Sequence, residues 1–290
     1  MAFAMSEYTP WHPPLRTRAK AAPTDEAQAQ SWRSRVLVAN GAHGRLAVAH
    51  LAALRNNTAL AKTAHRWLFD TFEIVMGDFN AIHAQMLDVS VDAVTHVHAT
   101  MPSYLPSVDY PVAAMPPSFD QVVVRRPLHV ELAKRQVWRL QRVKQFPRKQ
   151  MASRGIPSDH VPVEALVRTA SVQSEALRLA TWNVADPFYY AQHHAAASAA
   201  VGFLVDFEDQ RLRMVMDTIA RLMERNHVLG LQEVPKCIED DVVALAKGRR
   251  WSGVGLPTPA AADGEGGDAP RMFLLTAPNS GWTPETQPGW

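Results

Sequence analysis

The fold is decided by residues 156–184, which read IPSDHVPVEALVRTASVQSEALRLATWNV. The first part leads from the polar pair Asp159 and His160 into an apolar run, and the last part alternates between two faces up to Asn183. Both parts are typical of β-strands. The nine mostly polar or small residues 168–176 between them are few enough to connect antiparallel neighbours. We therefore expect Asp159, His160 and Asn183 to lie at the same edge of the same sheet.

Two further segments place polar residues at the ends of apolar strands. Residues 75–80 read VMGDFN, in which the glycine permits a tight exit from the strand and Asp78 and Asn80 follow at its carboxyl end. A plain turn is the alternative interpretation of this segment. Residues 230–234 read GLQEV, so a second buried strand delivers Glu233.

A hairpin and another strand supply two more polar residues. Residues 32–52 alternate apolar positions around a glycine-containing loop, which is typical of a β-hairpin, and the second strand ends at His50. Taken alone, His50 is an ordinary packed histidine. Residues 119–124 form a further apolar strand that carries Asp120 near its start.

These motifs resemble those of the endonuclease/exonuclease/phosphatase superfamily, which includes proteins like deoxyribonuclease I. A family domain begins with a strand that ends in Trp-Asn, as at Asn183, and finishes with a strand opened by Ser-Asp-His, as at residues 158–160. In this chain the Ser-Asp-His motif comes before the Trp-Asn motif, so the motifs stand in circularly permuted order. The resemblance implies an α/β fold of two packed β-sheets flanked by helices, a four-layer sandwich with its site at the rim where strand ends converge.

The domain organisation has two explanations. One circularly permuted domain is favoured, because each motif occurs once and the length suits one family domain. The alternative is two half-domains from a broken tandem pair, which need a partner copy to complete the site. We predict a flexible arm over residues 1–30, a single permuted domain over 31–254 with an early half over 31–167 and a late half over 177–254, and a Pro- and Gly-rich tail over 255–290.

The resemblance implies a metal site. Glu233 is its expected ligand, with Asn183 beside it and Asp159 completing the surroundings of the metal. Mg²⁺ is the expected ion and Mn²⁺ is the alternative, since oxygen ligands suit a hard cation that keeps several waters.

The resemblance also implies catalytic residues around one phosphate. Asp78 is expected to orient or deprotonate the attacking water, and Asn80 to donate a hydrogen bond to a phosphoryl oxygen. His50 and His160 are expected to face the phosphate. Asp120 is expected to hold His160 by a ring nitrogen, which fixes the tautomer of the imidazole.

Positive charge is concentrated in residues 125–154, which contain ten basic residues and one acidic residue and so have a net charge of +9. Part of this segment has the apolar period of an amphipathic helix with a basic face. A solvated helix face is one interpretation. A clamp for a nucleic-acid backbone or a polyphosphate is the other, because the segment comes just before the Ser-Asp-His strand. We assign substrate binding to Arg139, Arg142 and Lys144.

Composition bounds the remaining possibilities. With 290 residues, 47% apolar and 20% charged, the chain has the composition of an ordinary soluble globule, and its net charge of +2 is too small to indicate a partner. The one cysteine, Cys237, excludes an internal disulfide framework and is consistent with a reducing compartment. No apolar run approaches the roughly 20 residues of a membrane span. We therefore expect a soluble, cytoplasmic or nuclear protein without a membrane partner; the sequence does not predict its oligomeric state.

The expected function is Mg²⁺-dependent hydrolysis of phosphate esters by a nuclease or phosphodiesterase acting on nucleic acid. Residues 181–190, TWNVADPFYY, resemble the first strand of deadenylase-type members and favour RNA. One alternative is a phosphatase that acts on an inositol phosphate or another small phosphate ester. The other is a non-catalytic module that binds nucleic acid. The sequence does not distinguish endonuclease from exonuclease action.

Overall fold

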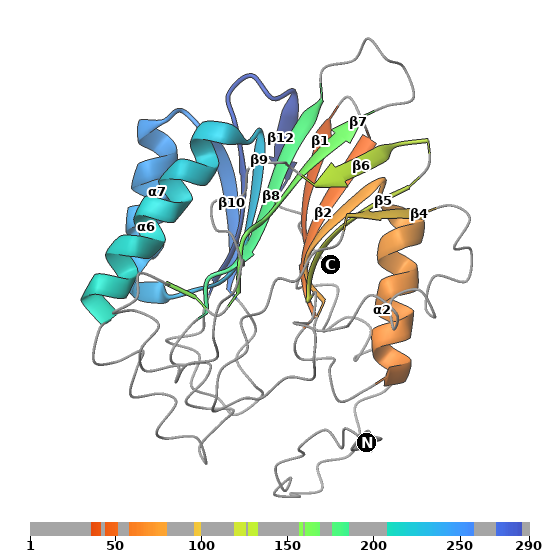
Figure 1. Ribbon diagram of the computed structural model, residues 1–290, viewed down its shortest axis with the longest axis horizontal. Coiled ribbons are helices and arrows are strands. Elements are labelled where there is room, and N and C mark those ends of the chain that lie inside the picture. Colours follow the sequence, from red (N-terminus) through yellow and green to blue (C-terminus); the bar gives the residue numbers. More distant parts are fainter. Residues whose placement is uncertain are drawn as a thin grey trace, which may run out of the picture.

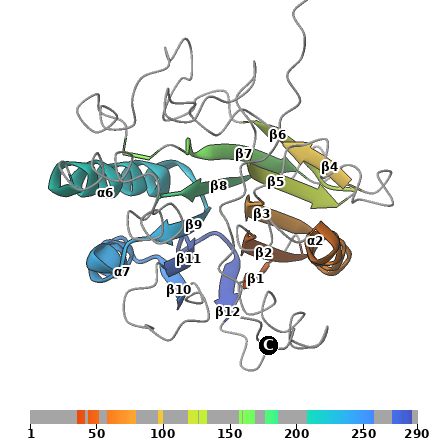
Figure 2. The same cartoon turned by 90° about the horizontal axis from the view of Figure 1, so that it is seen from below.

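The chain folds as two facing β-sheets with helices on their outer sides (Figure 1). The computed structural model describes residues 36–41, 44–51, 58–79, 96–99, 119–125, 127–132, 157–158, 160–168, 176–185, 208–257 and 271–285. Helix α2 (Thr58–Thr71) lies outside one sheet, and α6 (Glu208–Arg225) and α7 (Glu239–Gly248) lie outside the other, as Figure 2 shows from below. The expected α/β sandwich is confirmed.

The first sheet has six strands in the order β12-β1-β2-β3-β5-β4. Its strands are β1 (Val36–Gly41), β2 (Gly44–His50), β3 (Ile74–Asp78), β4 (His96–Ala99), β5 (Asp120–Arg125) and β12 (Trp282–Glu285). Strands β2 and β3 are parallel because α2 carries the chain back between them, whereas the other pairs are antiparallel. This β2-α2-β3 unit fixes where the polar ends of β2 and β3 lie.

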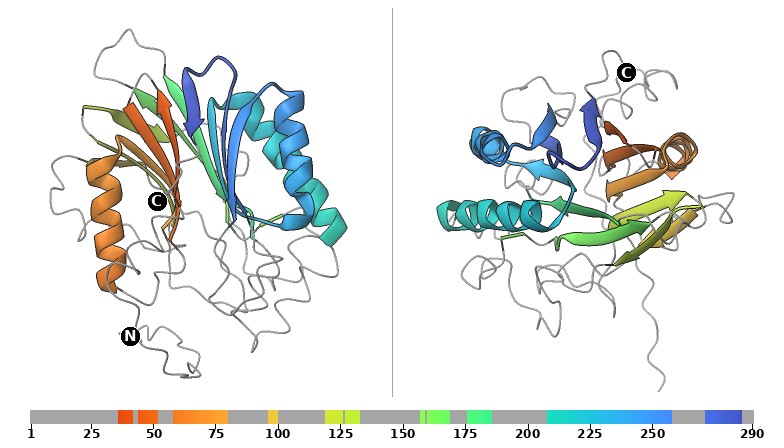
Figure 3. Two further views of the ribbon diagram at one scale, coloured as in Figure 1. Left: turned by 180° about the vertical axis from the view of Figure 1, so that it is seen from behind. Right: turned by 90° about the horizontal axis from the view of Figure 1, so that it is seen from above.

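The second sheet also has six strands, in the order β10-β11-β9-β8-β7-β6. Its strands are β6 (His129–Leu132), β7 (Val163–Arg168), β8 (Leu177–Asn183), β9 (Val228–Val234), β10 (Ser252–Pro257) and β11 (Arg271–Thr276). Strands β8 and β9 are parallel, with α6 as their crossover. A short 3-10 turn, Lys236–Ile238, leads from β9 into α7. Each sheet therefore contains one parallel pair with its helix outside, as the view from behind in Figure 3 shows.

The two strands within residues 156–184 are neighbours in the second sheet. Strand β7 pairs antiparallel with β8, with Val163 opposite Thr181 and Val167 opposite Leu177. This confirms the predicted pairing of the strand after His160 with the strand that ends at Asn183.

One apolar core lies between the sheets and contains side chains from both. Two further clusters pack α2 on the first sheet and α6 with α7 on the second. The sheets approach closely at Gly230, where an added Cβ would lie 2.9 Å from the Cγ atoms of Val48 and 3.1 Å from Met76 Cε. A glycine is therefore required here by the approach of the facing sheet, three residues before Glu233.

The region predicted as a Pro- and Gly-rich tail, residues 255–290, forms regular strands in its described part. Strand β11 pairs with β9 and β10, and β12 pairs with β1 at an edge of the first sheet. Trp282 of β12 packs over Gly41, where a Cβ would collide with the indole ring. The many glycines and prolines in this region favoured an irregular structure, although it also contains short apolar runs. Those runs form strands because they are buried by pairing with β9 and β1.

Two predictions fall where the structure describes no residues. The arm over residues 1–30 and the basic segment beyond Leu132, up to residue 156, lie outside the described ranges. Among the helices that are described, none is both long and apolar enough to cross a bilayer.

Candidate functional site

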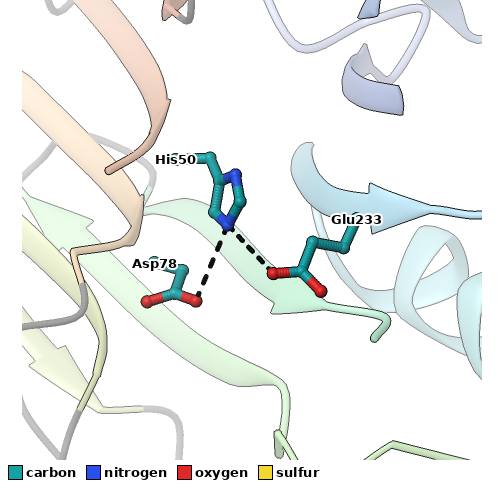
Figure 4. Close-up of side chains that lie close together, drawn as sticks. All are labelled: His50, Asp78 and Glu233. Carbon is teal, nitrogen blue, oxygen red and sulfur yellow. Dashed lines mark hydrogen bonds and ion pairs between the residues drawn. The ribbon is translucent and has the colours of Figure 1, made fainter. Parts of the chain in front are cut away.

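The ends of both parallel strand pairs meet at one place between the sheets. His50 and Asp78 are register partners at the ends of β2 and β3, whereas Asn183 ends β8 and Glu233 is the penultimate residue of β9. The carboxyl ends of parallel neighbours lie at the same edge of a sheet, so each sheet delivers two polar side chains to its rim. Figure 4 shows His50, Asp78 and Glu233 pointing toward one another from the two sheets.

The side chains of this cluster are joined by hydrogen bonds and one longer ion-pair contact. His50 Nε2 lies 3.0 Å from Glu233 Oε1 and 4.0 Å from Asp78 Oδ2. The Nδ2 of Asn183 donates to Asp78 Oδ2 at 2.8 Å and to Glu233 Oε1 at 3.0 Å. One amide thus bridges two carboxylates that come from different sheets. All four residues are at most 5% exposed, so water does little to screen these charges.

The orientation of the Asn183 amide is set by the main chain. Its Oδ1 accepts a hydrogen bond from the Ala185 N–H at 2.9 Å, which leaves the NH₂ group to face the carboxylates. Ala185 has φ +63°, a left-handed conformation that closes this Asx-type turn. In this arrangement Asn183 acts as a donor to Asp78 and Glu233, and its predicted role beside a metal stays a prediction.

A second pair lies beside the first cluster. His160 Nδ1 is 2.8 Å from Asp120 Oδ2, so the predicted histidine–aspartate contact is present. The main-chain N–H of His160 donates to Ser158 Oγ at 3.0 Å, and Ser158 Oγ donates to the Asn183 carbonyl at 2.8 Å. Asp120 and His160 are buried. The Ser158 hydroxyl therefore ties the His160 segment to the end of β8.

Burial and charge move the pKa values of the two facing carboxyl groups apart. Burial, followed by the charge of Asp120, raises the pKa of Asp78 to about 6. Burial also acts to raise the pKa of Glu233, but the hydrogen bond and charge of His50, with His160 and Asn183, outweigh it and hold this pKa below its usual value. The site thus pairs a carboxylate that stays ionised with a carboxyl group that can exchange a proton near neutral pH.

The backbone adopts left-handed conformations at Glu233 and beside Asp78. Glu233 has φ +52°, a left-handed conformation that costs a residue other than glycine roughly 1–3 kcal/mol. Gly77, next to Asp78, has φ +147°, and a Cβ there would collide with the Ala49 carbonyl oxygen. The turn at Glu233 directs its carboxylate toward His50, whereas a regular strand would alternate its side chains between the two faces.

Two overlapping groups in the described residues are spaced to hold a metal ion. The first is His50, Asp78 and Glu233, and the second is Asp78, Asp120 and His160; in each, one ligand atom per residue lies within 4.8 Å of the others. Asp78 belongs to both groups. Mg²⁺ usually takes one or two protein carboxylates and completes its shell with water, so the Glu233 and Asp78 pair fits such an ion.

The remaining predicted site residues are not described. Asn80, Asp159, Arg139, Arg142 and Lys144 lie outside the described ranges, and their roles stay predictions.

Sequence reasoning missed Arg211 on α6, a fully buried residue. It lies four residues before Val215 and eight before Ile219, on the apolar side of the helix. An arginine at helical spacing within an apolar stripe is the signal that could have found it.

Comparisons with known proteins add little to this geometry. No family model matches the sequence, and no curated protein matches it. Among solved structures, an endonuclease/exonuclease/phosphatase from Beutenbergia cavernae is similar at a TM-score of 0.29 and 11% sequence identity, over 77% of this chain and 66% of that one. The chain thus covers slightly less than two thirds of that protein. A similarity this low assigns neither a family nor an activity.

Proposed function

We propose that this protein hydrolyses phosphate esters with Mg²⁺ and that its substrate is nucleic acid. The observation that carries the proposal is the buried cluster to which both sheets contribute. Its members are His50, Asp78, Asn183 and Glu233, with the Asp120–His160 pair beside them. Buried charges add little to stability that apolar residues of similar size would not provide, so such a cluster at a sheet rim supports a chemical role.

The two carboxyl groups take different tasks in this proposal. Glu233, whose pKa is held low, is the anion that would hold the metal. When bound, Mg²⁺ would neutralise charge on the phosphoryl oxygens. Asp78, with its pKa raised to about 6, accepts a proton from the attacking water, because a general base works best with a pKa close to the working pH.

The remaining groups bind the phosphate or orient the two carboxylates. Asp120 contacts Nδ1 of His160, so we assign Nε2 of that ring to the phosphate. Asn183 donates to both carboxylates and fixes their separation. His50 contacts Glu233 and lies near Asp78, so it offsets the charge of both. Asn80 and Asp159 keep the roles that the sequence resemblance implies.

Nucleic acid is proposed as the substrate because of the basic segment. Residues 125–154 carry a net charge of +9 directly before the Ser-Asp-His strand, and Arg139, Arg142 and Lys144 are assigned to the phosphate backbone. The resemblance of residues 181–190 to deadenylase-type proteins favours polyadenylate.

The test is a substrate panel assayed with Mg²⁺, with Mn²⁺ and with excess chelator. The panel holds polyadenylate, duplex DNA with and without an abasic site, an inositol polyphosphate and a generic phosphodiester. We expect Mg²⁺-dependent cleavage of polyadenylate and no activity under chelator. Hydrolysis of the inositol polyphosphate alone would replace the nucleic-acid substrate with a small phosphate ester. Activity that survives full chelation contradicts the metal dependence, and binding of polyadenylate without turnover supports a non-catalytic module.

A further inference from the structure

A buried arginine joins two segments that the site depends on. Arg211 is 0% exposed, and its Nη1 donates to the carbonyl oxygens of Pro157 at 3.1 Å, Val184 at 3.1 Å and Ala185 at 3.0 Å. A guanidinium loses much hydration energy on burial, so a position like this needs bonds that replace the lost water. The three carbonyls supply such bonds, and they come from two segments far apart in sequence.

The first segment leads from the Arg211 contact to Asn183. Ala185, whose carbonyl Arg211 binds, has the left-handed φ of +63° and donates its N–H to Asn183 Oδ1. That bond turns the Asn183 amide so that its NH₂ reaches Asp78 and Glu233. A change in the Ala185 conformation would therefore rotate the amide that separates the two carboxylates.

The second segment leads to His160. Pro157, whose carbonyl Arg211 also binds, precedes Ser158, whose Oγ accepts from the His160 N–H and donates to the Asn183 carbonyl. His160 in turn contacts Asp120. The carbonyls that this guanidinium binds thus lie one and two residues after Asn183 and three residues before His160.

We propose that Arg211 is a positioning residue, which holds Pro157 and Ser158 against the 183–185 turn and so fixes Asn183 and His160 relative to Asp78 and Glu233. The contacts that carry this role are to three main-chain carbonyls. This proposal deepens the proposed hydrolase function, because the residues that it positions are those of the same site.

The test compares variants with graded donor capacity. Arg211→Met keeps much of the apolar stem and removes every donor, whereas Arg211→Lys keeps the charge and three N–H donors on a shorter stem. The control is Arg225→Met on the same helix, where the guanidinium binds buried Glu164 at 2.7 Å. Thermal unfolding of all variants identifies a temperature at which each is folded, and the later measurements are made there.

Three readouts follow. The first is the NMR signal of the His160 Nδ1 proton, identified by its loss in a His160→Gln variant and measured without metal. The second is affinity for Mn²⁺ alone by titration calorimetry, and the third is kcat and KM on the cleaved substrate. For Arg211→Met we expect the His160 signal to broaden or move, Mn²⁺ affinity to fall roughly 10-fold or more, and kcat to fall more than KM rises. Arg211→Lys should recover part of each, and Arg225→Met should change none.

The outcomes separate this inference from the proposed function. An unchanged His160 signal and unchanged Mn²⁺ affinity in folded Arg211→Met overturn the positioning role, whatever the activity. The same result in Arg225→Met as in Arg211→Met also overturns it, since the loss would then be a general effect of losing an arginine from α6. If the wild-type protein hydrolyses nothing in the panel, the His160 signal and Mn²⁺ binding still decide the role of Arg211.

Discussion

Single residues at this site compensate for charges that burial makes costly. Two carboxylates from different sheets approach the same amide, and the desolvation of each opposes ionisation. Asn183 and His50 lower that cost for Glu233, while Asp78 keeps a raised pKa. Without these partners, the two carboxylates would repel each other and the rim of the sandwich would be less stable. Glu233 is therefore the residue whose charge can be tested most directly.

Replacement of Glu233 by Gln should remove metal binding while keeping the fold. The amide has nearly the same shape and can still accept from Asn183, but it lacks the charge that holds a cation. We expect the rate to fall roughly 100-fold or more and the Mg²⁺ concentration for half-maximal rate to rise, with little change in unfolding temperature. The control is Glu224→Gln, which removes a carboxylate of α6 that pairs with Arg249 at a distance of 3.0 Å. An unchanged rate and Mg²⁺ dependence in Glu233→Gln would show that Glu233 is not the ligand.

The site residues could be predicted from the sequence more fully than the hydrogen bonds between them. Six residues singled out from strand-end motifs come together as expected: His50, Asp78, Asp120, His160, Asn183 and Glu233. The direction of the Asn183 amide could not be predicted, because it depends on the Ala185 N–H and on a left-handed turn that no residue type requires. The apolar stripe of α6 could have revealed that Arg211 is buried, but not which main-chain carbonyls it binds, because carbonyls leave no pattern in the sequence.

At the scale of elements, two parallel strand pairs with their helices deliver the site. The units β2-α2-β3 and β8-α6-β9 each carry polar residues at the ends of two parallel strands. Helix α2 therefore affects the site through its packing against the first sheet. The buried side of α2 carries His65, which is 2% exposed. Its ring centroid lies 5.9 Å from that of Phe69 and 5.6 Å from that of Phe79. Phe79 directly follows Asp78, so the packing of α2 extends to the site.

His65 should make the stability of this protein depend on pH. Neither of its ring nitrogens has a hydrogen-bond partner among the described residues, and burial lowers its pKa from 6.5 to about 4. The unfolded chain therefore binds a proton at a higher pH than the folded chain does. Its contribution to stability is complete above pH 6.5 and is lost as the pH falls toward about 4, with a total change of about 3 kcal/mol.

The measurement is urea unfolding across that pH interval for the wild type and for His65→Leu. We expect His65→Leu to lose less stability than the wild type as the pH falls, because it has no ring to protonate. His129→Gln, at an exposed position of β6, serves as the control and should keep the wild-type slope. Equal slopes for the wild type and His65→Leu would contradict the argument.

Element boundaries were predictable where the apolar period was long and clear. The β1–β2 hairpin and the β7–β8 pair follow from the alternation of apolar and polar residues. Strands β11 and β12 did not, because each is short and lies among glycine and proline residues. Their conformation depends on pairing with β9 and β1, which are distant in sequence, and a local pattern cannot contain that information.

At the scale of the whole molecule, both halves of the sequence contribute to one core and one site. Strands from each half line the apolar space between the sheets, and β12 from the end of the described chain pairs with β1 from its beginning. Asp78 comes from the early half and Glu233 from the late half, and both bond to the same Asn183 amide. One chain thus contributes both halves in this structure, and we keep a single permuted domain as the prediction, with two half-domains that need a partner copy as its alternative.

Mixing two inactive variants should therefore fail to restore activity. Asp78→Asn damages only the early half of the site and Glu233→Gln only the late half. If each chain closes its own site, every chain in the mixture carries one defect, and activity stays at the level of the separate variants even after joint unfolding and refolding. If copies exchange halves, random pairing gives intact sites in some mixed dimers and restores about a quarter of the wild-type activity. Light scattering on the wild type at the assay concentration provides the matching mass, which we expect to be that of one 32.1 kDa chain. Recovery near a quarter, together with a dimer mass, would replace the single permuted domain with a pair of chains that complete each other.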